Sequence, residues 1–227
     1  MTGTTAGPGS TVTGVPSALP WLTGAWVRSA RAYGGGPPSE CSDVVWVQVG
    51  PWFTDFRLPR PGASGTHPYD RARAFSGVLG VRQAEGTTAA VEWHHDLDTD
   101  GAADGGSAAT PDAGTLVLAG GLLVETGDGY VEWWSRPSGT SGQPDGAAAE
   151  WVVEHRDADG GVDARMVCSD GMAAAVWGDG GAWCDQTSGW VPTRLTGVPC
   201  PFEMAAVAVA AAGRAPLPDG WRRPEAP

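Results

Sequence analysis

Short runs in which apolar and polar residues alternate recur along this chain, and Gly, Asp and Pro separate one run from the next. Side chains two positions apart share a face of a strand, so this period of two predicts β-strands. We expect strands at residues 25–32, 44–49, 52–58, 75–83, 89–97, 115–119, 122–125, 130–136, 151–156, 164–168, 173–177 and 189–192. Because closure removes exposed edges, strands joined by short turns favour an all-β fold, an antiparallel up-and-down barrel of about eight to ten strands with little helix.

Residues 202–212 (FEMAAVAVAAA) form the one run with a helical composition. Alanine favours a helix there, although the low amphipathicity would also suit a last buried strand. Segments rich in Gly, Pro, Ser and Thr predict a flexible N-terminal tail at 1–20 and flexible loops at 102–114 and 137–147. A Pro-rich C-terminal tail is expected at 214–227, which leaves a single β-barrel domain at 21–213.

The composition describes a turn-rich globular chain, with 41% hydrophobic and 18% charged residues, 35 Gly and 19 Pro. A net charge of −12 repels phosphate backbones and anionic lipids, so we expect neither nucleic-acid nor membrane partners. The N-terminus lacks the basic and apolar parts of a signal peptide, and no apolar run approaches the ~20 residues of a membrane span. The expected location is therefore cytoplasmic. The four cysteines form no C-x-x-C pair, which argues against a zinc knuckle or a thioredoxin-type motif.

Several segments resemble a known class of barrels. Leu22-Thr23-Gly24-Ala25-Trp26 resembles the G-x-W that opens the first strand of lipocalins and related calycin barrels. The stretches VWVQ (45–48), WFTDFRLP (52–59), VEWHH (91–95) and YVEWWSR (130–136) resemble a largely uncharacterised group of bacterial lipocalin-like proteins. This resemblance extends over residues 22–177 as an order of strands. It implies a barrel with a small-molecule cavity, a tryptophan that closes one end and a late arginine packed over it, for which Arg194 is a candidate.

Strand faces that mix aromatic and polar residues predict which side chains line the cavity, because a water face is polar and a plain core face is apolar. The expected lining consists of Trp46, Gln48, Phe53, Asp55, Arg57, Trp93, His95, Tyr130, Glu132, Trp134, Trp151 and His155. Leu97 shares the inner face with His95, whereas Glu92, His94, Asp96 and Asp98 are expected to meet water. The apolar opposite faces of 44–49 and 52–58 then need a cover, either the N-terminal tail, the 202–212 segment or a partner in a homodimer. If those faces are instead the core, Asp55 and Arg57 form a surface pair.

The polar members of this lining suggest acid–base chemistry. Asp55 and Arg57 lie two apart, so Asp55 can hold the Arg57 guanidinium ready for a carbonyl or carboxylate oxygen. Glu132 and His95 are candidates for general acid and base, with their pKa values shifted by surrounding tryptophans. Alternatively, Glu132 is a structural acid paired with Arg136 or Arg57.

Other chemistries find little support in the sequence. Adjacent side chains of a strand point to opposite faces, so His94 and His95 are not expected to bind one metal ion, and we expect no metal, haem or other cofactor. Residues 96–101 (DLDTDG) open like an EF-hand loop, but the twelfth position is Ser107 instead of Glu. Nucleophile elbows, Walker loops and Rossmann glycine patterns are absent from the sequence.

Three functions are compatible with these features. The first is a cofactor-independent isomerase, cyclase or hydratase acting on an apolar bacterial secondary metabolite, with Asp55, Arg57, His95 and Glu132 as catalytic residues. Its substrate would contact the remaining lining residues: Trp46, Gln48, Phe53, Trp93, Tyr130, Trp134, Trp151 and His155. The second is a non-catalytic carrier or sensor of a hydrophobic small molecule. The third is a structural or interaction domain whose tryptophans form the core.

Overall fold

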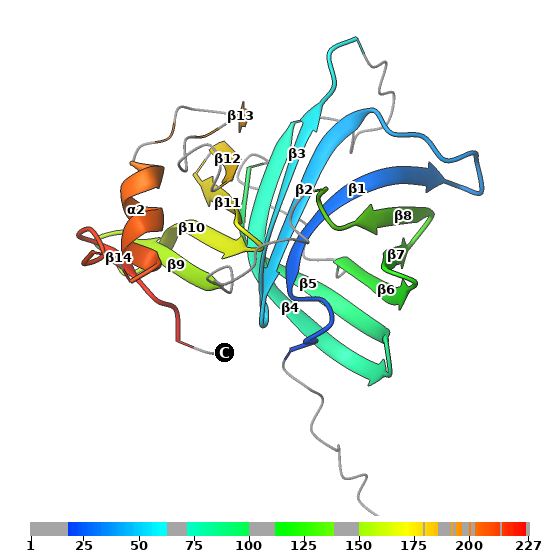
Figure 1. Cartoon of the computed structure of the whole chain (residues 1–227), viewed down its shortest axis with the longest axis horizontal. Coiled ribbons are helices and arrows are strands. Elements are labelled where there is room, and N and C mark those ends of the chain that lie inside the picture. Colours follow the sequence, from blue (N-terminus) through cyan, green and yellow to red (C-terminus); the bar gives the residue numbers. More distant parts are fainter. Residues whose placement is uncertain are drawn as a thin grey trace, which may run out of the picture.

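Eight consecutive strands close into an antiparallel up-and-down barrel in a computed structural model of the chain (Figure 1). In chain order they are β1 (Gly24–Tyr33), β2 (Ser42–Val49), β3 (Trp52–Pro59), β4 (Arg73–Glu85), β5 (Thr88–Asp98), β6 (Asp112–Ala119), β7 (Leu122–Gly127) and β8 (Tyr130–Ser135). The last strand pairs with the first, with Tyr130 opposite Tyr33, so the barrel has no free edge. The all-β antiparallel barrel expected from the alternation is confirmed.

The structure describes residues 18–62, 72–99, 112–138, 150–178, 180–185, 192, 194–196, 200, 203–213 and 215–225. Residues 1–17 of the expected N-terminal tail lie outside this part, but Leu19 at its end is buried. Most of the two expected loops, residues 102–111 and 139–147, also lies outside it. The first loop was placed too long, because its last residues, 112–114, begin β6.

A second sheet of six strands packs against the outside of the barrel (Figure 1). Its order is β13-β12-β11-β10-β9-β14, with β9 (Trp151–Arg156), β10 (Val162–Ser169), β11 (Met172–Trp177), β12 (Gly180–Asp185), β13 (Arg194–Thr196) and β14 (Trp221–Arg222). The strands expected at 151–156, 164–168 and 173–177 are therefore present, but they form this second layer and are not part of the barrel. The expected strand at 189–192 lies almost wholly outside the described residues, while β12 is a strand that the alternation did not predict.

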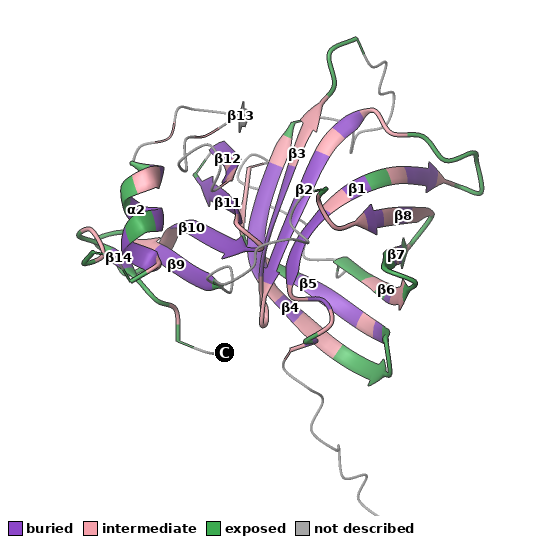
Figure 2. Ribbon diagram, viewed as in Figure 1, coloured by how far each residue is buried: buried purple, intermediate pink, exposed green. Residues whose placement is uncertain are grey.

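The two layers share an apolar interface formed by the outward faces of β2 and β3. Val45 and Val47 pack in one buried cluster with Val167, and Phe56 packs in another with Val176. In Figure 2, buried residues dominate the strands on both sides of this interface. The outward apolar faces predicted to need a cover are thus covered by the chain's own second sheet. This second sheet was not among the covers considered from the sequence.

The far face of the second sheet is covered by helix α2 (Met204–Ala211), which confirms a helix within residues 202–212. Met204, Val207 and Ala208 pack in a buried cluster with side chains of β9 to β12. In the described part of the chain, no helix is both long and apolar enough to cross a bilayer. The expected C-terminal tail is partly ordered instead, because β14 pairs with β9 and Trp221 is buried against the same cluster.

One end of the barrel is closed by Trp26, whose ring lies 3.7 Å from the guanidinium carbon of Arg136. Arg136 donates to Thr23 O at 2.8 Å and to Asp170 Oδ2 at 3.2 Å, and Asp170 also accepts from Ala25 N. The arginine packed over the first-strand tryptophan is therefore Arg136 and not the candidate Arg194, which lies in β13. Asp170 belongs to the turn between β10 and β11, so this contact also ties the second sheet to the barrel.

Gly24→Ala is expected to destabilise the protein by about 3 kcal/mol, from backbone strain and overlap together. Gly24 has a φ of +136°, and a Cβ there would overlap the Arg136 guanidinium and approach Asp170 Oδ2. The matched control is Gly121→Ala, at φ +83° in open space, with an expected loss of about 1 kcal/mol. Urea unfolding of both variants measures the loss in the free energy of unfolding. Equal losses would show that the packing of Arg136 does not depend on the absence of a side chain at position 24.

Candidate functional site

The side chains that point into the barrel separate into an apolar end and a charged end. At the apolar end, the Trp46 ring centroid lies 5.4 Å from that of Trp134 and 6.3 Å from that of Trp93, both in edge-on geometry. Trp46 Nε1 donates to Gln48 Oε1 at 3.1 Å. Together with Phe53, these four residues point inward as predicted, but they fill this end as a packed core that includes Trp26, Leu79, Leu116 and Leu123.

The charged end lies where β1, β3, β5 and β7 finish and β2, β4, β6 and β8 begin. Strands all around the barrel contribute ionisable side chains there: Arg28, Arg31, Asp55, Arg57, Arg73, His95, Asp98, Asp112, Glu125, Tyr130 and Glu132. Their burial decreases outward, from 2% side-chain exposure at Glu132 through 13% at Arg57 to 48% at Asp112. The charged side chains are thus most buried at Glu132, next to Trp134 on the same strand face, and most exposed at the rim of the barrel.

Asp55 and Arg57 form a two-pronged ion pair inside the barrel. Arg57 Nε donates to Asp55 Oδ1 at 2.7 Å, and Nη2 donates to Oδ2 at 3.1 Å. The pair is thus interior, as the mixed strand face predicted, and is not a surface pair. Burial lowers the pKa of Arg57, but the charges of Asp55 and Glu132 raise it more, so the guanidinium is a fixed cation of this end.

Glu132 is held by two arginines of the neighbouring strand β1. Its Oε1 accepts from Arg28 Nη1 at 2.7 Å and from Arg31 Nε, while Arg28 also binds Glu40 through Nε and Nη2. A bulge after Arg28 lets residues three apart, Arg28 and Arg31, share the inner face. Glu132 Oε2 is buried and has no hydrogen-bond partner among the described residues. The structural partners suggested by the sequence, Arg136 and Arg57, are not its hydrogen-bond partners here.

Glu125 faces Glu132 directly across the pair of strands β7 and β8. Its Oε1 accepts from the Tyr130 hydroxyl at 2.7 Å. Burial and then the charge of Glu132 hold the pKa of Glu125 well above its usual range, against the opposing effect of the Tyr130 hydrogen bond. Burial also raises the pKa of Glu132 and outweighs the opposing charges of Arg57 and Arg28, so its net shift is upward as well. The two opposed carboxyls therefore have different environments, because Glu132 binds two arginines whereas Glu125 binds the Tyr130 hydroxyl.

His95 lies on the inner face of β5, between two carboxylates. Its Nδ1 is 3.1 Å from Asp98 Oδ2, and its Nε2 is 3.3 Å from Asp112 Oδ2. Burial lowers the pKa of His95, but the two neighbouring carboxylates, Asp112 and Asp98, raise it more, so the net shift is upward. The imidazole also stacks on Phe75, with centroids 4.5 Å apart, and the Phe75 ring lies 5.0 Å from the Arg57 guanidinium carbon.

The position of Asp98 corrects two predictions from the alternation. In the pairing of β4 with β5, His95 lies opposite Gly77 and Leu97 lies opposite the adjacent Ser76. Asp96 therefore has no partner on β4 and forms a β-bulge. Beyond this bulge the faces exchange, so Asp98 points inward to His95 and to Arg73, whose Nε donates to it at 3.1 Å. Leu97 points outward instead and packs against the cluster of Phe56 at the layer interface. His94 remains exposed on the outer face, as expected.

Trp151 and His155 do not line the barrel, which corrects their prediction as substrate-binding residues. Both belong to β9 of the second sheet, where Trp151 packs in the buried cluster under α2. His155 Nδ1 lies 2.6 Å from Asp163 Oδ1, and the ring is 5.7 Å from that of Trp221. Alternation identified their shared face correctly, but it carries no information on which sheet a strand joins.

The stability that His95 contributes is expected to depend on pH. Because its pKa is raised on folding, this contribution is fully present below pH 6.5 and is lost as the pH rises through the folded pKa. His95→Gln is therefore expected to reduce the free energy of unfolding at pH 5.5 and to have a smaller effect at pH 9. His94→Gln, on the outer face of the same strand, is the matched control, with little effect at either pH. A His95→Gln effect that does not change with pH would contradict the two-carboxylate environment.

Comparisons with known proteins support the fold alone. No protein-family model and no curated protein matches this chain. A crystal structure of the uncharacterised protein YLR301w from Saccharomyces cerevisiae is similar, with a TM-score of 0.50 and 10% sequence identity over 72% of this chain and 74% of that chain. At this identity the similarity concerns architecture and supports a barrel, without placing the chain in the lipocalin family.

Among the described residues, no group of three or more His, Cys, Asp or Glu side chains is arranged to hold a metal ion.

Proposed function

We propose that the charged end of the barrel binds a small molecule and moves a proton within it, as a cofactor-independent isomerase. The observation that carries this proposal is the pair Glu125 and Glu132, which are directly opposed on β7 and β8 and have different partners, Tyr130 for Glu125 and two arginines for Glu132. A neutral acid beside an ionised base is the arrangement that acid–base catalysis at neutral pH requires.

The proposed roles follow from the hydrogen bonds. Glu132 Oε2, which no described group occupies, accepts a proton from a carbon next to a carbonyl. Arg57, held by Asp55, stabilises the negative charge that develops on the carbonyl oxygen. Glu125 gives its proton to a second atom of the same molecule, and transfer of the abstracted proton from Glu132 back to Glu125 restores the starting state. In the product, one proton has moved to another atom of the molecule, and the double bonds have shifted accordingly.

The substrate proposed for this end is smaller and more polar than the sequence alone suggested. Trp46, Phe53 and Trp134 are almost completely buried against one another, so they form the floor under a ligand instead of a deep apolar slot. Arg57, Arg73 and His95 would face the ligand's oxygens, while Phe75 offers an apolar surface. A small metabolite with a carbonyl or carboxylate group fits this combination.

A solvent-exchange screen tests the proposal. Candidate carbonyl and carboxylate compounds are incubated with the protein in D2O, and ¹H NMR follows the loss of a carbon-bound proton. The wild-type chain is expected to exchange one such proton, whereas Glu125→Gln is expected to remain folded and to lose turnover by about 100-fold or more. Unchanged turnover in Glu125→Gln, with the exchange still present, would rule out this carboxyl pair as the catalytic machinery.

A non-catalytic carrier is the second candidate, and one observation favours it. Most charges at this end already neutralise one another, because Asp55 uses both oxygens on Arg57 and Arg28 binds both Glu40 and Glu132. Such a network gives a rigid, selective mouth without a poised nucleophile. A compound that binds in the screen but never exchanges a proton would support the carrier.

A further inference from the structure

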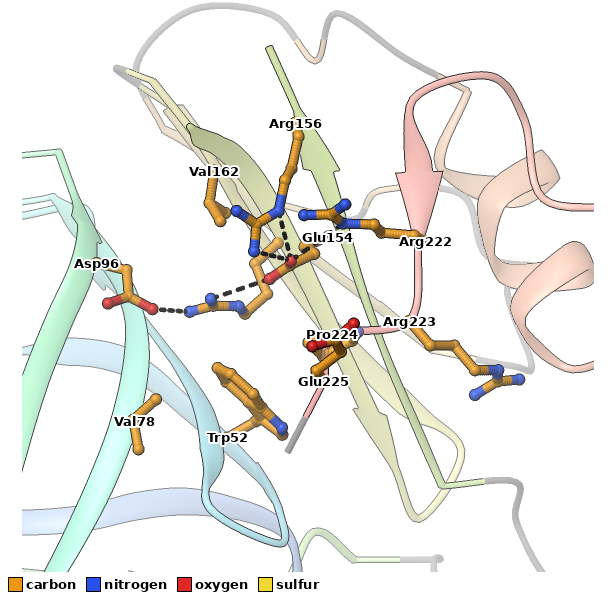
Figure 3. A pocket seen from close by; sticks show the side chains of 11 residues that line it. Trp52, Val78, Asp96, Glu154, Arg156, Val162, Arg222, Arg223, Pro224 and Glu225 are labelled. Atoms are coloured by element: carbon orange, nitrogen blue, oxygen red, sulfur yellow. Dashed lines mark hydrogen bonds and ion pairs between the residues drawn. The ribbon is translucent and has the colours of Figure 1, made fainter. Parts of the chain in front are cut away.

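A separate cavity of about 720 Å³ lies outside the barrel, between β3, β4 and β5 on one side and the second sheet with the C-terminal segment on the other (Figure 3). Trp52, Val78 and Asp96 line it from the barrel. Glu154, Arg156, Arg165 and Arg222 are among its lining residues on the second sheet. The charged end of the barrel faces the lumen, so the two sites are on opposite sides of the barrel wall.

The floor of this cavity holds a buried arginine. The Arg165 side chain is only 1% exposed, and its guanidinium carbon lies 4.6 Å from the Trp52 ring. Arg165 Nη1 lies 2.7 Å from Asp96 Oδ2, and Nη2 donates to Glu154 Oε2 at 3.3 Å. Its Nε is also buried and has no hydrogen-bond partner among the described residues. Its Nε N–H is therefore a donor that no described protein group uses and that a polar ligand can accept from.

Several arginines gather around one buried carboxylate on the second-sheet side of the cavity. Glu154 binds Arg156 at 2.6 Å and Arg165 at 3.3 Å, and lies 3.6 Å from Arg222, so three guanidiniums compete for one carboxylate (Figure 3). In all, four arginines and three acidic residues line the cavity, although the whole chain carries a net charge of −12. The fourth arginine, Arg223, donates to Ala211 O at the end of α2. Most of the Arg222 side chain remains accessible, with 55% exposure.

We propose that this outer cavity binds a small organic anion, with a carboxylate or phosphate group attached to a flat apolar body. Arg222 and Arg165 would hold the anionic group, because guanidinium groups match planar and tetrahedral oxyanions. The body would lie against Trp52, Val78 and Val162, the apolar part of the lining. This site needs no residue of the barrel interior and is therefore independent of the proposed isomerase.

Isothermal titration calorimetry with benzoate and phenyl phosphate as probes tests this site in the full chain. At least one probe is expected to bind with a 1:1 stoichiometry, more weakly at high salt, and about tenfold more weakly to Arg222→Gln. Arg222 is half exposed, so its replacement is expected to leave the fold intact. The matched control is Arg60→Gln, which removes an exposed arginine of the Asp43 ion pair on the barrel surface and should leave probe affinity unchanged.

Further measurements separate the contribution of the anionic group from that of the apolar body. They also distinguish binding in the outer cavity from binding in the barrel. Binding of benzoate alone, of phenyl phosphate alone or of both would support the site. The comparison of the two affinities would identify the preferred anionic group. Benzyl alcohol, the neutral probe, is expected not to bind, and Glu125→Gln in the barrel is expected to bind the anions as the wild type does. Absence of binding by both anions, equal affinity for benzyl alcohol, or unchanged affinity in Arg222→Gln would overturn the proposal.

Discussion

Glu132→Gln is expected to destabilise the protein by roughly 3 kcal/mol, because it leaves two buried arginines without their shared negative charge. Arg28 and Arg31 both bind Glu132 Oε1, and all three side chains are at most 4% exposed. We place the loss at the lower end of the usual range of about 3–5 kcal/mol for breaking a buried pair. Arg28 keeps Glu40, and the glutamine oxygen still accepts a hydrogen bond. Urea unfolding at pH 7 measures the change.

Glu125→Gln, the same substitution on the facing strand, is expected to have the opposite sign. The pKa of Glu125 is raised on folding, so its favourable contribution is complete below pH 4.5 and is lost as the pH rises toward the folded pKa. The amide cannot ionise and escapes this loss, so Glu125→Gln should be more stable than the wild type at pH 7 and equal to it near pH 4. Similar losses in both glutamine variants at pH 7 would contradict the assignment of one neutral and one ionised carboxyl.

Val167→Asp is expected to destabilise the protein by about 4 kcal/mol or more, because it buries a carboxylate between the two layers. Val167 is fully buried on the face of β10 that packs against Val45 and Val47 of the barrel. Leu122→Asp is the matched control, since Leu122 is 38% exposed on the outside of β7 and should change stability by less than about 0.5 kcal/mol. Chemical unfolding of both variants decides whether the second sheet is the cover of the barrel. A tolerated Val167→Asp would mean that the layers separate in solution.

The alternation of apolar and polar residues was sufficient to predict the barrel strands and most inward-facing side chains. It placed Trp46, Asp55 and Glu132 on the inner face, where they lie, because the period of two follows directly from strand geometry. It failed beyond the bulge after His95, where one extra residue exchanges the two faces. A second bulge, after Arg28, lies in a strand for which no face was predicted. Nothing in the local sequence marks these bulges.

Sheet membership and cross-strand partners could not be predicted in the same way. Trp151 and His155 share the expected face of one strand, β9, but long-range pairing puts this strand in the second sheet. The partners of Glu132 on β1 depend on barrel closure, which joins residues about 100 positions apart. Glu125 was overlooked as a site residue, although its position two residues after Leu123 on the inner face of a strand was a usable signal. The apolar outer faces of β2 and β3 did indicate a cover without revealing which segment supplies it.

The protonation state of Glu125 is the most direct test of the proposed acid–base site. Carboxyl ¹³C NMR of glutamate-labelled protein, followed from pH 4 to pH 9, reports each glutamate separately, and the Glu125→Gln variant assigns its signal. This one signal is expected to titrate well above pH 4.5, because burial and the charge of Glu132 raise the pKa of Glu125. The proposed isomerase further requires that Glu125 is still protonated at pH 7 while Glu132 is ionised. A Glu125 signal that titrates at the ordinary glutamate value would contradict the neutral acid and, with it, the proposed isomerase.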